Sequence, residues 1–242
     1  MAPFGILYTL KERVHPRSRK VLAAAALNGL ELEVPADFDA GVTNKTPEFL
    51  AKFPLGQIPT FESKSKSGSS GSGSFLLAES TAIAQHVADS GPRREQLLGR
   101  TAETRALNQQ WILFNDLQFE TTAKDLVAWR LGTEAYRAER ETKAAADVRR
   151  WLDRYEGHLK SGDSGTGSPP GRAWFVNADA EGPSLADVVI GGTVFILYLA
   201  YMDAQMREEY PYVLRFYEGL KRVPELTELY TGPLLEKRKE PE

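Results

Sequence analysis

The stretch "KFPLGQIPTFES", residues 52–63, decides how the first part of this chain is interpreted. Its strand-like end begins with a proline, Pro59, directly behind Ile58. Proline has no N–H to donate to a neighbouring strand, so it is found at the first residue of a strand or at a sheet edge. The main-chain groups of Ile58 therefore face something other than a paired strand, which can be solvent, a packed loop or a ligand.

Strand and helix patterns alternate on both sides of this stretch. One helix is indicated by proline at its entry and Asn28-Gly29 at its exit, and another by Thr46 as N-cap before Pro47. We expect the order β-α-β-α-β-β-α over residues 1–90, an α/β domain. The segments are "FGILYTL", "PRSRKVLAAAALNG", "LELEV", "TPEFLAKF", "IPTFES", "SFLLAE" and "ESTAIAQHVADSG".

Residues 101–160 carry no strand signal, and we expect an all-helical domain over residues 95–242. Ser184 and Asp187 stand three apart before an apolar run, as in a capping box. That run, residues 188–202, has 15 residues and is too short to span a bilayer, so we expect a buried helix. Two Ser/Gly-rich stretches, Ser63–Ser74 and Ser161–Gly171, predict flexible loops.

Composition excludes several classes of function. The apolar fraction of 42% and charged fraction of 26% are ordinary for a globular protein, and a net charge of −3 gives no reason to expect a nucleic-acid or membrane partner. The chain has no cysteine and only three histidines, so we expect no disulfide, no metal site and no protein-borne sulfur nucleophile. The N-terminus has no signal-peptide pattern, and we expect a cytoplasmic protein.

Two motifs, "LGQIPTF" and "ESTAI" (Glu79–Ile83), resemble the glutathione transferase superfamily. The blocks "TNKTPEFLAKFPLGQIPTFE" and "NQQWILFN" are similar to the glutathione transferase-like domain of translation elongation factor 1B gamma. The resemblance covers nearly the whole chain and implies a thioredoxin-like α/β domain followed by an all-α domain. Elongation factor 1B gamma continues into a further domain, whereas this sequence ends at Glu242. We therefore expect an enzyme before a translation-factor scaffold.

The resemblance also implies glutathione as the cofactor. The residue before the proline, in relatives joined to it by a cis bond, would pair with the cysteinyl backbone, and Ser80, as N-cap of the following helix, would receive the γ-glutamyl carboxylate. A plain helix cap is the alternative for Ser80, and a solvated surface lysine is the alternative for Lys45. The residues implied in glutathione binding are Asn44, Lys45, Gln57, Ile58, Pro59, Glu79 and Ser80.

A glutathione transferase must stabilise the glutathione thiolate, and the group that does so here is open. Related classes use Tyr, Ser or Cys near the first strand, but the chain has no Cys, and Val14 stands where some classes place the Ser. The candidates are Tyr8, which can equally be a core residue, His15, which can equally be an exposed loop residue, and Arg17. Arg17 belongs to a basic cluster, with Lys11, Arg13, Arg19 and Lys20, that is otherwise a solvated face.

The expected partner is an electrophilic small molecule, in a pocket lined by Asn115, Gln118 and Phe119. The first functional hypothesis is a homodimeric glutathione S-transferase that adds the thiol to this electrophile. One alternative is a glutathione-dependent cis/trans isomerase of a conjugated alkene in secondary metabolism. Another is a non-catalytic scaffold that pairs with a translation-factor partner.

Overall fold

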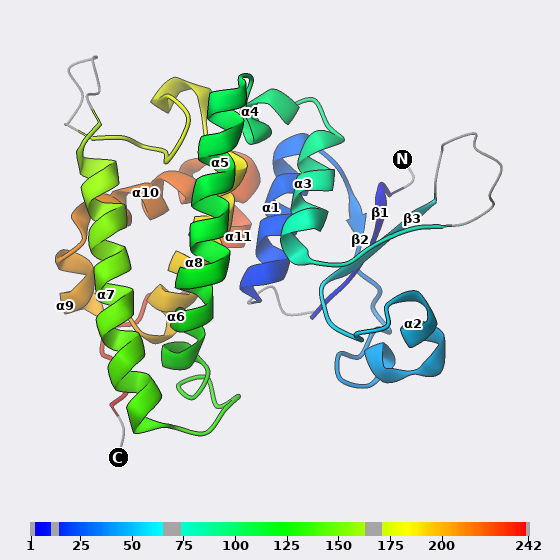
Figure 1. The fold of residues 1–242 in the computed structure, drawn as a ribbon, viewed down its shortest axis with the longest axis horizontal. Coiled ribbons are helices and arrows are strands. Elements are labelled where there is room, and N and C mark those ends of the chain that lie inside the picture. Colours follow the sequence, from blue (N-terminus) through cyan, green and yellow to red (C-terminus); the bar gives the residue numbers. More distant parts are fainter. Residues whose placement is uncertain (1–2, 11–14, 65–73, 163–170, 241–242) are drawn as a thin grey trace.

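The computed structural model describes residues 3–10, 15–64, 74–162 and 171–240 (Figure 1). A four-stranded sheet has the order β2-β1-β3-β4. Strand β1 pairs in parallel with β2, whereas β3 runs antiparallel to both β1 and β4. The strands are β1 (Gly5–Tyr8), β2 (Leu32–Glu33), β3 (Thr60–Lys64) and β4 (Ser74–Leu77). The predicted strand "LELEV" is thus reduced to two residues at an edge of the sheet.

Three helices accompany the sheet: α1 (Pro16–Asn28), α2 (Pro47–Lys52) and α3 (Ser80–Asp89). Proline starts α1, and Gly29 ends it with a left-handed φ of 63°, as its sequence predicted. Thr46 caps α2 by accepting a hydrogen bond from the N–H of Phe49, which confirms the predicted cap. Helices α1 and α3 pack together and lie between the sheet and the helical part of the molecule (Figure 1).

The rest of the described chain is helical. Helix α8 forms its centre, and its capping box is confirmed, because Ser184 and Asp187 exchange side-chain-to-backbone hydrogen bonds. The helices are α4 (Arg94–Leu98), α5 (Ala102–Phe114), α6 (Glu120–Val127), α7 (Ala138–Lys160), α8 (Leu185–Ala200), α9 (Ala204–Glu208), α10 (Pro211–Arg222) and α11 (Thr227–Tyr230). A π-helical turn, η2 (Asn115–Phe119), joins α5 to α6, and short 3₁₀ turns occupy η1 (Thr43–Lys45), η3 (Asp179–Glu181) and η4 (Pro224–Leu226).

The sheet-containing and helical parts share one apolar core. Helix α1 packs against both α3 and α8, and a single cluster of buried side chains includes Leu7, Val21, Trp111 and Leu197. The observed order is therefore a thioredoxin-like α/β arrangement followed by an all-α arrangement. The division into domains 1–90 and 95–242 stays a prediction.

Two features of the sequence analysis are placed only in part. Most of the predicted loops Ser63–Ser74 and Ser161–Gly171 lies outside the described residues. Among the helices of the described ranges, none has the length and apolar character needed to cross a membrane.

Candidate functional site

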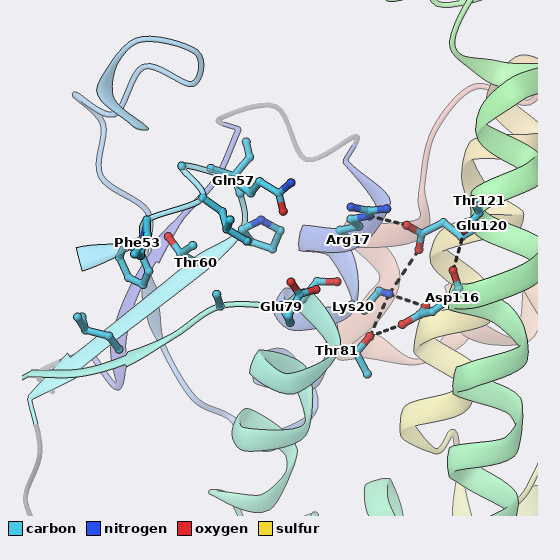
Figure 2. Close-up of a pocket in the computed structure, with 18 of the residues that line it drawn as sticks. Arg17, Lys20, Phe53, Gln57, Thr60, Glu79, Thr81, Asp116, Glu120 and Thr121 are labelled. Atoms are coloured by element: carbon cyan, nitrogen blue, oxygen red, sulfur yellow. Dashed lines mark hydrogen bonds and ion pairs between the residues drawn. The ribbon is translucent and has the colours of Figure 1, made fainter. Parts of the chain in front are cut away.

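A cleft of about 680 Å³ opens where the sheet-containing and helical parts meet (Figure 2). One wall consists of the loop at residues 53–59, which leads into β3, and of the residues that begin α3. The opposite wall comes from the end of α5, from η2 and from the start of α6. Helix α1 supplies Arg17 and Lys20 between them.

The loop before β3 is held from behind by two of the predicted binding residues. Asn44 Nδ2 and Lys45 Nζ both donate hydrogen bonds to the carbonyl of Gly56, at 2.6 and 2.8 Å. Gly56 has a φ of 53°, and a Cβ there would lie 2.5 Å from the carbonyl oxygen of Asn44, so only glycine fits. Asn44 and Lys45 therefore position the loop and do not line the cleft, in contrast to the direct ligand contact that was expected.

The remaining predicted residues of this loop do line the cleft: Gln57, Ile58 and Pro59. The Ile58–Pro59 peptide bond is cis. No backbone hydrogen bond joins Ile58 to another described residue, because β3 begins only at Thr60. Thr60 also lines the cleft, and its buried hydroxyl has no hydrogen-bond partner within the described ranges. The main chain of Ile58 and the side-chain hydroxyl of Thr60 thus both offer unpaired polar groups beside the cleft.

Glu79 and Ser80 line the same wall of the cleft as this loop. The structure places Glu79 in the cap position and Ser80 as the first residue of α3, so the helix begins one residue earlier than expected from the sequence. Glu79 has a φ of 68°, which turns the chain sharply into the helix. The first backbone bond of α3 runs from the N–H of Ile83 to the carbonyl of Glu79, so the N–H groups of residues 80–82 have no intrahelical acceptor. This helix end favours an anion.

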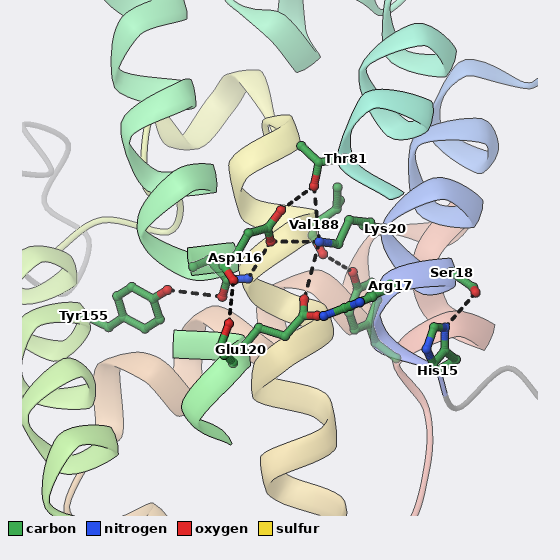
Figure 3. A network of polar contacts seen from close by, with 12 residues as sticks. His15, Arg17, Ser18, Lys20, Thr81, Asp116, Glu120, Tyr155 and Val188 are labelled. Atoms are coloured by element: carbon green, nitrogen blue, oxygen red, sulfur yellow. Dashed lines mark hydrogen bonds and ion pairs between the residues drawn. The ribbon is translucent and has the colours of Figure 1, made fainter. Parts of the chain in front are cut away.

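A buried charge network joins α1 to the other wall (Figure 3). Lys20, whose side chain is only 1% exposed, lies 2.8 Å from Asp116 Oδ1 and 3.4 Å from Glu120 Oε2. Its ammonium also donates to the hydroxyl of Thr81, which in turn donates to the second oxygen of Asp116. All three N–H groups of Lys20 therefore have an acceptor within the protein.

Arg17 is the predicted activator that does line the cleft. Its Nε donates to Glu120 Oε1 at 2.8 Å, and this bond raises the pKa of the guanidinium. The side chain is 52% exposed. Figure 2 shows it between Glu120 on one side and Gln57 on the other. A permanent cation thus faces the space between the two walls.

The other two candidate activators lie outside the cleft lining. The Tyr8 hydroxyl donates to Glu62 at 2.9 Å, and burial together with this bond raises the pKa of Tyr8 to about 12. Its ring packs against Phe38, Phe49 and Phe53, as the core alternative expected.

His15 Nδ1 lies 2.9 Å from the hydroxyl of Ser18, and burial together with Arg17 lowers the pKa of its imidazole. Val14, Lys11 and Arg13 lie outside the described residues.

The residues expected to line an electrophile pocket, Asn115, Gln118 and Phe119, do not line this cleft. Asn115 is buried and accepts a hydrogen bond from Tyr155, Phe119 packs into the core, and Gln118 is exposed away from the cleft. The π-helical turn changes the angle between successive side chains, and other residues of this segment face the cleft instead. The residues that the helix presents to the cleft are Leu113, Asp116, Leu117, Glu120 and Thr121.

Two acids in this wall, Asp116 and Glu120, were missed by the sequence analysis. Their four-residue spacing is a signal that was present, since it puts two carboxylates on one face of a helix that otherwise has core residues. Their partner Lys20 had been assigned to a solvated face, and it is buried instead.

Comparisons with known proteins find similarity in both sequence and fold. The model of the protein family described as "Glutathione S-transferase, N-terminal domain" matches residues 6–89. The glutathione S-transferase-like protein LUC7 of Fusarium sp is 40% identical over 97% of this chain and 96% of its own length. Elongation factor 1-gamma of Equus caballus is 33% identical over 88% of this chain, which matches 43% of that longer protein.

A solved structure with similar architecture is the glutathione transferase homolog from Lodderomyces elongisporus, which holds two glutathione molecules per subunit. It superposes with a TM-score of 0.74 at 17% identity over 95% of this chain and 98% of its own, so it supports the fold. The relative from Fusarium extends this agreement to the sequence of almost the entire chain. The chain therefore belongs to the glutathione S-transferase family.

Proposed function

We propose that this protein is a glutathione transferase-type enzyme, which binds glutathione in the cleft and brings its thiol to an electrophilic small molecule. One observation carries the proposal. The unpaired main chain of Ile58 and the free N–H groups at the start of α3, next to Glu79, face the same cleft. An extended peptide with a carboxylate and an ammonium group at one end is complementary to that arrangement.

The proposed contacts follow from the chemistry of each group. Ile58 pairs its main chain with the cysteinyl backbone, and Ser80 with the neighbouring N–H groups receives the γ-glutamyl carboxylate. Glu79 is exposed to the cleft and can pair with the ammonium group of the same residue. Gln57 offers an amide to the far end of the peptide. The glutathione transferase homolog from Lodderomyces elongisporus, which has the same fold and holds glutathione, supports this assignment.

Arg17 is the group we propose for thiolate stabilisation. A cysteine-like thiol has a pKa near ~8.5, and a fixed positive charge lowers it. The ammonium group of Lys20 already donates hydrogen bonds to three acceptors, and the hydroxyl of Tyr8 donates a hydrogen bond to Glu62. Neither group therefore stabilises the thiolate. The electrophile then lies against Leu113 and Leu117, which are 51% and 66% exposed at the opposite wall.

The same groups allow two reactions with an electron-poor alkene. Attack of the thiolate forms a carbon–sulfur bond and an enolate. Protonation of the enolate completes conjugation. Rotation about the former double bond, followed by loss of the thiolate, instead gives the isomerised alkene and returns glutathione. We rank conjugation first.

Dimethyl maleate tests both reactions with one probe. A product heavier by one glutathione, with one thiol consumed per product, supports conjugation. Dimethyl fumarate, which has the mass of the probe, formed with no thiol consumed, would assign the isomerase function. Reactions without enzyme at the same glutathione concentration provide the baseline for both products.

The alternative of a non-catalytic scaffold that pairs with a translation-factor partner is supported by the 33% identity to elongation factor 1-gamma. It predicts no glutathione binding and no enzyme-dependent product from any electrophile. We also propose that the protein acts in the cytoplasm as a homodimer, which size-exclusion chromatography with light scattering tests by a mass of twice the 26.9 kDa of the chain.

A further inference from the structure

The cation that faces the cleft is held by a carboxylate from the opposite wall. We propose that Glu120 is a positioning residue, which fixes the direction of the Arg17 guanidinium toward the sulfur of bound glutathione. This inference rests on the proposed function, and it assigns to Glu120 a role that it performs through Arg17.

The two oxygens of Glu120 serve two different cations. Oε1 accepts from Arg17 Nε at 2.8 Å, and Oε2 accepts from Lys20 Nζ at 3.4 Å. Binding at Nε fixes the plane of the guanidinium and leaves the two Nη groups for other acceptors. An exposed arginine without such an anchor samples many rotamers, so its charge is spread over a larger volume.

The anchor is rigid because its second cation is buried. The Glu120 side chain is 11% exposed and that of Lys20 is 1% exposed. Lys20 is fixed in turn by Asp116 and by Thr81 at the first turn of α3. Figure 3 shows this chain of contacts crossing from α1 and α3 to η2 and α6. Movement of Glu120 would require the whole network to rearrange.

The spacing of the charged residues along each helical segment explains why the two cations meet the two carboxylates. Arg17 and Lys20 are three residues apart on α1, and Asp116 and Glu120 are four apart along η2 and α6. Each pair lies on one face of its helix, so two cations meet two carboxylates across the boundary. The π-helical turn lies where these carboxylates begin, and such turns frequently occur at functional sites.

Two explanations of the role of Glu120 predict opposite changes in the thiol pKa when its carboxylate is removed. The guanidinium of Arg17 interacts with the carboxylates of Glu120, Asp116 and Glu79, and Lys20 and His15 lie nearby on its own segment. If Glu120 acted only as a negative charge beside the cleft, its removal would favour the thiolate and lower the thiol pKa. If Glu120 positions Arg17, its removal releases the cation and raises the thiol pKa.

The test is the thiol pKa of bound glutathione, measured from thiolate absorbance during a pH titration of the full chain. We expect Glu120→Ala to raise this pKa by about one pH unit, which is about tenfold less thiolate at neutral pH. Glu120→Gln keeps an oxygen that accepts from Nε, so we expect it to retain most of the wild-type value. A lower thiol pKa in both variants, or a thiol pKa that is unchanged in both, would overturn the inference.

Arg17→Lys keeps the test decisive if Glu120→Ala does not fold. Lysine retains the charge but cannot be held by the same Nε bond, so we expect the thiol pKa to rise here too. In an Arg17→Ala background, Glu120→Ala should produce no further rise. A wild-type pKa in Arg17→Lys would show that a positive charge alone suffices, and would also overturn the inference.

The outcomes separate this inference from the proposed function. If the wild type binds no glutathione, both are overturned. If it binds glutathione with a lowered thiol pKa that Glu120→Ala leaves unchanged, the positioning role alone fails.

Discussion

The two walls of the cleft differ in what they present to a ligand. The wall formed by residues 53–59 and the start of α3 offers main-chain groups, at Ile58 and at the N–H groups of Ser80 and Thr81, beside the side chains of Gln57 and Glu79. The wall formed by α5, η2 and α6 presents side chains, with leucines beside carboxylates. A main-chain site follows from local sequence, because prolines and helix starts are local signals. A side-chain wall depends on how a helix is rotated in its tertiary environment.

Removal of the buried lysine should have the largest effect, and on folding before binding. Lys20→Ala removes the buried cation from Asp116 and leaves Glu120 with Arg17 as its remaining cation. We expect the free energy of unfolding to fall by about 3–5 kcal/mol. Urea denaturation measures this value.

The matched control for Lys20→Ala is Arg94→Ala at an exposed ion pair. Arg94 pairs with Asp89, and their side chains are 66% and 54% exposed. This substitution should cost less than about 1 kcal/mol. Equal losses in the two variants would show that the buried network contributes no more than a surface pair.

The main-chain wall should be most sensitive at Glu79 and Ser80. Each of Glu79→Ala and Ser80→Ala leaves one charged group of glutathione without its partner, so we expect a loss of about 1–3 kcal/mol of binding free energy. Isothermal titration calorimetry measures it, with the exposed Glu95→Ala as the control. Normal binding by both site variants would place the glutathione site elsewhere.

The predictable part of the site consists of such local features. Gln57, Ile58, Pro59, Glu79 and Ser80 were identified from two short motifs, and all five line the cleft. The helix ends at Thr46, Gly29 and the Ser184–Asp187 capping box were also predicted, because each depends only on residues that are close in the sequence. The fold class followed from the order of these local elements.

The remainder depended on contacts between distant residues. Lys20 has the sequence context of an exposed helix, and contacts with Asp116 and Glu120, 96 and 100 residues away, make its burial tolerable. The π-helical turn has no local signature in "NDLQF", so the side chains that this segment presents to the cleft could not be predicted from regular helical spacing. Asn44 was expected at the ligand from the family resemblance, and its hydrogen bond to Gly56, 12 residues away, has no local signal in the sequence.

The corrected face of the side-chain wall can be tested with neighbouring residues. Leu117 is 66% exposed and lines the cleft, whereas Gln118 does not. We expect Leu117→Ala to lower kcat/KM for an apolar electrophile about tenfold, which corresponds to about 1.4 kcal/mol. Gln118→Ala should leave it unchanged, and the melting temperatures of the two variants should agree. A larger effect from Gln118→Ala would restore the original assignment.

Tyr8→Phe should have the smallest effect on the chemistry. Burial and the bond to Glu62 raise the pKa of Tyr8 to about 12, so the phenol is neutral near pH 7. Glu62 keeps Lys52 as a partner in the variant, and we expect a loss of about 1 kcal/mol in stability. The thiol pKa of bound glutathione should not change. A rise in that pKa would mean that Tyr8 reaches the sulfur.

The central claim is that the main-chain wall is a glutathione site, and the melting temperature tests it most directly. At a glutathione concentration one hundred times its Kd, the folded state should gain about 2.7 kcal/mol, which raises the melting temperature of the wild type. Glu79→Ala at the same concentration should show a smaller rise. A melting temperature of the wild type that stays constant across millimolar glutathione would contradict the claim.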